Sequence, residues 1–141
     1  MNILRYATVI LAFVFITPAT AQEQTLSERE ILTLIVAEGF SVPAVISGYC
    51  IQNSEDHLVK AEANEVFKRA KYLFMLFNRP NSVSDDFKQD VADVMEVYNE
   101  ELLKMVFAHE RSGKPTICNL KNFEAINNDM TTLARLFLDS A

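Results

Sequence analysis

The chain has 141 residues, of which 50% are hydrophobic and 23% are charged, with a formal net charge of −6 at pH 7. This length suits one ordinary domain built around a single core. The net negative charge disfavours nucleic acid and anionic lipid as partners, because both would repel the protein. It is compatible with a basic protein as the partner. Nucleophile motifs of the GxSxG and SxxK kinds are absent.

The first 21 residues have the layout of an export signal. Arg5 precedes an apolar run from Tyr6 to Ile16, and the stretch that ends at Ala21 has the small-x-small pattern cut by signal peptidases. We therefore expect a mature chain of residues 22–141, periplasmic or secreted, without a membrane span. An uncleaved anchor is the alternative, although the run covers only about half of the roughly 20 residues that cross a bilayer.

Both cysteines, Cys50 and Cys118, fall in the expected mature chain. Export to an oxidising compartment predicts a disulfide between them. A cross-link that closes a loop of this length stabilises a fold by about 4 kcal/mol in the chain-entropy model. Two unrelated free thiols are the alternative. A catalytic thiol is disfavoured, because neither cysteine has an adjacent histidine.

Two helical segments are predicted before the centre of the chain. Ser27 and Glu30 have the spacing of a capping box, which predicts a helix over residues 28–38. Gly39 is typical of a helix end. The stretch Pro43–Ile51 then predicts a short second helix.

The centre of the chain, residues 54–78, carries the most regular apolar pattern. Its repeating members are Val59, Ala63, Val66, Ala70, Leu73 and Phe77. Steps of four and three place all of them on one side of an α-helix. We expect a break near Asn53 with Ser54 as the N-cap, and Pro80 as the end. A single bent helix from Pro43 to Asn78 is the alternative.

Two further helices complete the pattern. The third, over about residues 83–111, has the apolar stripe Phe87, Val91, Val94, Tyr98, Leu102 and Met105, thickened by Met95, Val106 and Phe107. The fourth, over about residues 120–138, has the stripe Phe123, Ile126, Met130, Leu133 and Phe137. No stretch alternates with the period of a strand. The sequence thus predicts an all-α, compact antiparallel bundle of four main helices plus the short one, clamped by one disulfide.

Metal and cofactor sites are not indicated. His57 and His109 have no carboxylate or second histidine three or four residues away, the spacing that helical metal sites use. A haem held between His109 and Met75 or Met130 is conceivable chemically, but methionines at core spacing usually pack. We expect no cofactor and no metal.

The outer face of the third helix is the first candidate binding surface. Its carboxylates recur at helical spacing: Asp86, Asp90, Asp93, Glu96 and Glu100. This acidic strip could dock a basic protein, with fast and salt-sensitive association. An ordinary solvated face is the alternative, since the helix dipole favours acids near a helix start.

The apolar run at residues 72–77 is the second candidate. Tyr72, Phe74, Met75 and Phe77 cannot all share one helix face. Any that stay exposed would offer a patch for a partner helix, a second subunit or an apolar ligand. The alternative is that the first and last helices cover them.

These patterns rank three functions. The first is a non-enzymatic exported protein that binds another protein, as an inhibitor, an immunity-type protein or an accessory of envelope machinery. The second is a carrier of an apolar small molecule or cofactor within the bundle. The third is an enzyme without a recognisable motif.

Overall fold

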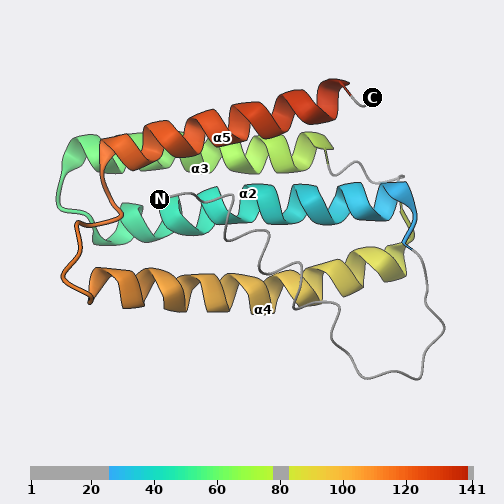
Figure 1. Ribbon diagram of the computed structural model, residues 1–141, viewed down its shortest axis with the longest axis horizontal. Helices are drawn as coiled ribbons and strands as arrows, with labels where there is room; N and C mark the ends of the chain where they lie inside the picture. The colour runs from blue at the N-terminus through green and yellow to red at the C-terminus, as the bar shows by residue number, and fades with distance from the viewer. Residues whose placement is uncertain (1–25, 78–82, 140–141) are drawn as a thin grey trace.

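The computed structural model describes residues 26–77 and 83–139, which form four α-helices. They are α2 (Glu28–Asn53), α3 (His57–Phe77), α4 (Asp85–Glu110) and α5 (Leu120–Asp139). Successive helices run in opposite directions (Figure 1), and the described residues include no strand. The all-α antiparallel bundle predicted from the sequence is therefore confirmed. The predicted export signal at residues 1–21 and the predicted stop at Pro80 lie outside the described residues.

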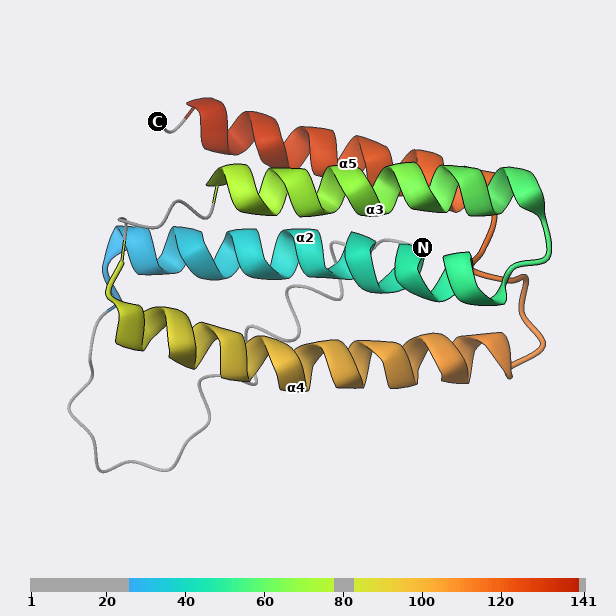
Figure 2. The ribbon, with the colours of Figure 1, turned by 180° about the vertical axis from the view of Figure 1, so that it is seen from behind.

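The central element is α2, which packs against each of the other three helices. On one side it contacts α3 and α5, which also pack on each other, and on the other side it contacts α4 (Figures 1 and 2). The core divides accordingly into a larger cluster from α2, α3 and α5 and a smaller cluster between α2 and α4. The result is that α4 is attached mainly through one neighbour.

Helix α2 runs through the position where the sequence predicted an interruption. The expected end at Gly39 and the separate short helix Pro43–Ile51 are wrong, because both lie inside α2. Pro43 removes one helical hydrogen bond, at a cost of about 3 kcal/mol. Burial of Phe40 and Ile46 against the larger cluster, at roughly 1.5–3 kcal/mol each, offsets that cost.

Gly39 is explained by packing instead of helix termination. A Cβ atom at this position would lie 2.1 Å from Cδ2 of Leu133. The missing side chain therefore lets α5 bring Leu133 directly against the backbone of α2. A glycine that admits a neighbouring helix and a glycine that ends its own helix look alike in the sequence.

The break between α2 and α3 is confirmed, and the alternative of one continuous helix to Asn78 is wrong. Ser54 caps the C-terminus of α2, where its amide donates to the carbonyl of Cys50. The N-terminus of α3 is capped by Asp56, whose carboxylate accepts hydrogen bonds from the amides of Leu58 at 2.8 Å and Val59 at 3.3 Å. The prediction of Ser54 as N-cap is thus wrong by two residues, since the carboxylate is the stronger acceptor.

The apolar stripes of α3 and α5 are confirmed. In α3 the first four members, Val59, Ala63, Val66 and Ala70, are buried, and Leu73 and Phe77 pack at the edge of the same cluster. In α5 the buried members are Phe123, Ile126 and Met130, with Leu133 and Phe137 at the edge. A hydrogen-bond network joins the polar flanks of the two helices.

That network centres on Arg69 of α3. Its guanidinium donates to Oδ1 of Asn127 at 3.1 Å and to Oγ1 of Thr131 at 2.7 Å. The amide of Asn127 donates in turn to Oε1 of Glu62 at 3.1 Å. These bonds between groups on two helices set the register of α3 against α5.

The buried face of α4 is rotated relative to the predicted stripe. Val94 and Met105 were expected inside, but they are 42% and 41% exposed, whereas Met95 and Val106 are buried. The members at Val91, Tyr98 and Leu102 are buried as predicted. With α2 as its main neighbour, α4 needs only a narrow buried stripe. Several apolar side chains therefore remain exposed on it: Val94, Val97, Leu103, Met105 and Phe107.

The predicted disulfide between Cys50 and Cys118 is present, with a Cα–Cα distance of 5.4 Å. It joins the last turn of α2 to the segment that leads into α5. The same segment is held to the end of α4, because the carboxylate of Glu110 accepts from the Ile117 amide at 2.6 Å and from the Thr116 hydroxyl at 2.9 Å. Three helices are thus fastened together at one end of the bundle.

By length and composition, α2 would also pass as a membrane span. It contains an 18-residue window with a mean hydropathy of 1.8, and it is the one helix among the described residues that meets this criterion. From the sequence we expect no membrane span after residue 21. Its packing against the other three helices accounts for part of this apolar composition, since 39% of the window is buried.

Candidate partner-binding surface on α4

The negative charge of the protein is concentrated on α4. This helix carries eight Asp and Glu residues against two Lys residues. Outside it, the remaining 11 of 19 acidic residues balance the remaining 11 of 13 basic residues. The formal charge of −6 therefore resides on one helix that has one main neighbour.

The acidic strip predicted from the sequence lies on the solvent-exposed side of this helix. All five of its carboxylates are exposed: Asp86, Asp90, Asp93, Glu96 and Glu100. Both lysines of α4 pair with other residues, Lys88 with Asp85 at 2.9 Å and Lys104 with Glu101 at 2.6 Å. Across residues 26–77 and 83–139, no carboxylate of the strip forms an ion pair. A basic partner would therefore meet unpaired charges.

The apolar run at residues 72–77 is divided by the fold. The ring of Phe77 lies between those of Phe40 and Phe137, with centroid distances of 6.2 and 5.2 Å. Phe74 packs against both core clusters. Only Tyr72 and Met75 remain largely outside, at 64% and 65% exposed. The predicted four-residue patch is therefore not one surface.

A groove of about 710 Å³ lies between α2 and α4. Buried Met95 and partly buried Val45 line its inner part, and Leu103 and Phe107 line its open side. The ring of Phe107 stands edge-on to that of Tyr49 on α2, with the centroids 5.3 Å apart. The groove is therefore apolar inside and is built on rigid helices.

Polar groups also converge on this groove. Glu96 and Glu100 of the acidic strip lie on its rim. Asn99, between them in sequence, has a buried Oδ1 atom without a hydrogen-bond donor in the described part of the chain. A buried acceptor without a donor is costly, so this side chain lowers the stability of the α2–α4 contact.

A half-buried carboxyl group, that of Glu38, lies near Tyr98 at the α2–α4 interface. Burial raises the pKa of Glu38 above its ordinary 4.5. Burial, and then the nearby Glu38 carboxylate, raise the pKa of Tyr98 to about 12. Each shift means that the folded protein disfavours the ionised form.

These shifts predict the effect of pH on Glu38→Gln. Because the folded state holds the Glu38 proton more tightly than the unfolded state, the carboxyl favours folding below its unfolded pKa, and this contribution is lost as pH rises. Glu38→Gln should therefore raise the free energy of unfolding near neutral pH, with a gain that shrinks toward about pH 4. Urea unfolding across this range measures it, with Asp129→Asn on α5 as the control. A gain that grows on acidification would contradict the assignment.

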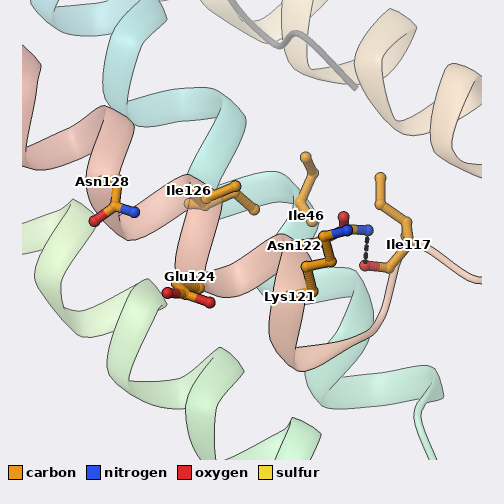
Figure 3. A pocket seen from close by; sticks show the side chains of 8 residues that line it. Ile46, Ile117, Lys121, Asn122, Glu124, Ile126 and Asn128 are labelled. Atoms are coloured by element: carbon orange, nitrogen blue, oxygen red, sulfur yellow. Dashed lines mark hydrogen bonds between the residues drawn. The ribbon is translucent and has the colours of Figure 1, made fainter.

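A smaller pocket of about 250 Å³ lies between α2 and α5 (Figure 3). The dashed line in the figure marks the bond from the Asn122 amide to the Ile117 carbonyl, 3.0 Å long. The side-chain amide of Asn122, which faces this pocket, therefore already donates a hydrogen bond to the segment before α5. The pocket offers less to a ligand than the α2–α4 groove does.

The histidines lie apart from both surfaces. The Nε2–H of His109 donates to the carbonyl of Pro115 at 3.0 Å, and His57 is exposed at the start of α3. Met130 is buried in the core, and Met75 is 65% exposed near the C-terminal end of α3, whereas His109 lies near the C-terminal end of α4. Among the described residues, no three His, Cys, Asp or Glu side chains gather in a way that could hold a metal ion.

Sequence reasoning found the acidic strip but missed the groove beside it. The position of Asn99, Leu103 and Phe107 in the groove depends on the rotation of α4 on α2, and no sequence motif marks these residues. Comparisons with protein-family models, with curated proteins and with solved structures each gave no match.

Proposed function

We propose that this chain is an exported, non-enzymatic protein that binds a basic partner protein through α4. Residues 1–21 serve as the export signal, and residues 22–141 form the mature helical domain in the periplasm or outside the cell. The disulfide between two buried cysteines is compatible with that compartment. The domain would act as an inhibitor, an immunity-type protein or an accessory of envelope machinery.

The observation that carries this proposal is the combination of charge and attachment on α4. The helix holds the whole formal charge of the protein and packs mainly on α2, so that most of its circumference faces solvent. Its apolar side chains stay exposed beside the carboxylates, as Leu103 and Phe107 illustrate. Protein interfaces commonly combine apolar contacts at their centre with charged groups at their rim. The charges would steer the partner toward α4, and the apolar side chains would make the contact.

Charge reversal on the acidic strip tests the proposal. The double variant Asp90→Lys/Asp93→Lys should bind the captured partner about tenfold more weakly at low salt, because both carboxylates are exposed and steer the encounter. The difference should shrink at about 1 M salt, where screening acts over roughly 3 Å. The measurement is affinity against ionic strength for the complex recovered from the envelope fraction of the native host.

The matched control is Glu124→Lys/Asp129→Lys, which reverses two exposed charges on α5. This variant has the same net charge as the α4 variant and should bind within about twofold of the wild-type protein. Equal weakening by both variants would show an effect of overall charge only. Unchanged binding by the α4 variant would remove the acidic strip from the interface.

A further inference from the structure

We propose that the α2–α4 groove receives one face of a basic amphipathic helix that belongs to the partner. This inference rests on the proposed function and specifies the chemistry of its binding site. The partner helix would place an apolar side chain in the groove and a Lys or Arg one turn away, against the rim carboxylates.

The interior of the groove supplies the apolar half of the site. Leu103 and Phe107 are 36% and 42% exposed on one wall, and the buried Met95 closes the floor. The edge-on contact between Phe107 and Tyr49 fixes the position of that wall. Two helices that run in the same direction, α2 and α4, hold a shallow apolar channel between them (Figure 1), and a groove between helices that receives a third helix is a recurrent mode of peptide recognition.

The rim supplies the charged half. Glu96 and Glu100 lie one turn apart on the groove side of the acidic strip, and both are exposed. Glu96 makes no ion pair among the described residues. Arg and Lys supply hydrogen-bond donors that exposed carboxylates accept.

Charge complementarity also indicates which kind of molecule would occupy the groove. A second copy of the chain would bring one acidic α4 against another, and like charges at an interface disfavour association. The N-terminal residues 1–25 contain one basic residue, Arg5, and cannot present two cations at helical spacing. A cationic helix from another protein satisfies both the apolar floor and the acidic rim.

A synthetic peptide of about four helical turns tests the inference, with Leu along one face and Lys and Arg one turn away. Its affinity for the mature protein is measured by calorimetry at low and high salt. Leu103→Ser and Glu96→Lys should each weaken binding about tenfold, the loss expected of central contacts. The control Leu58→Ser removes a leucine that is 69% exposed on α3, and it should change affinity less than about twofold.

Two comparison peptides separate the two halves of the site. Replacing the cations with Glu, or the leucines with Ser, should abolish measurable binding. Equal binding of all three peptides, or equal loss in the Leu103 and Leu58 variants, would overturn the inference. If Asp90→Lys/Asp93→Lys weakens the natural complex while Leu103→Ser does not, the groove is not the binding site, and the proposed function stands. If neither variant weakens that complex, both fail.

Discussion

Removing the disulfide through Cys50→Ala/Cys118→Ala should lower the free energy of unfolding by about 4 kcal/mol, one of the two largest effects expected in this protein. The two positions are 68 residues apart in sequence, so the bridge restricts a long loop in the unfolded chain. It also fastens the end of α2 to the segment before α5. Urea unfolding of the oxidised wild-type and variant proteins measures the difference.

Reduction of the wild-type protein provides the control. A reductant should lower the stability of the wild-type protein toward that of the variant and leave the variant unchanged. A variant within about 1 kcal/mol of the oxidised wild-type protein would show that the bridge contributes little, against the expectation from loop length.

Truncation of the central aromatic side chain of α5 should lower the stability by a similar amount. Phe123 is fully buried in the cluster shared by α2, α3 and α5. Phe123→Ala should therefore cost about 3–5 kcal/mol, from lost burial and the cavity left behind. The matched control is Tyr72→Ala, which removes an aromatic ring that is 64% exposed and should stay within about 0.5 kcal/mol.

The same unfolding measurement compares both aromatic variants. Similar losses from Phe123→Ala and Tyr72→Ala would mean that the larger cluster is not the core of the fold. A loss confined to Phe123→Ala would support the division of the core into a larger cluster and a smaller one under α4.

The helices themselves could be predicted from the sequence because their apolar periodicity is strong. The stripes of α3 and α5 were placed correctly, since each of these helices packs against two others and needs a broad, regular apolar face. Helix α2 was divided in error at Gly39 and Pro43. Both residues usually end helices, but tertiary packing overrides this preference. Gly39 leaves space for the side chain of Leu133, and Pro43 is buried within α2.

The register of α4 could not be predicted, because several of its flanking residues are apolar. Val94 and Met95 are both plausible members of a stripe, and only the position of α2 decides between them. The acidic strip was found because carboxylates at helical spacing are visible in one chain. The groove was missed, because it forms between residues of two helices whose relative placement the sequence does not encode as a motif.

Site-specific photocrosslinking in the native host tests most directly whether the α2–α4 groove is the binding surface. A photoreactive amino acid replaces Leu103 in the groove or, as the control, Leu58 on α3, both exposed leucines. The account predicts one discrete protein adduct from position 103 that is lost with Asp90→Lys/Asp93→Lys, and none from position 58. An adduct from position 58 without one from position 103 would contradict it.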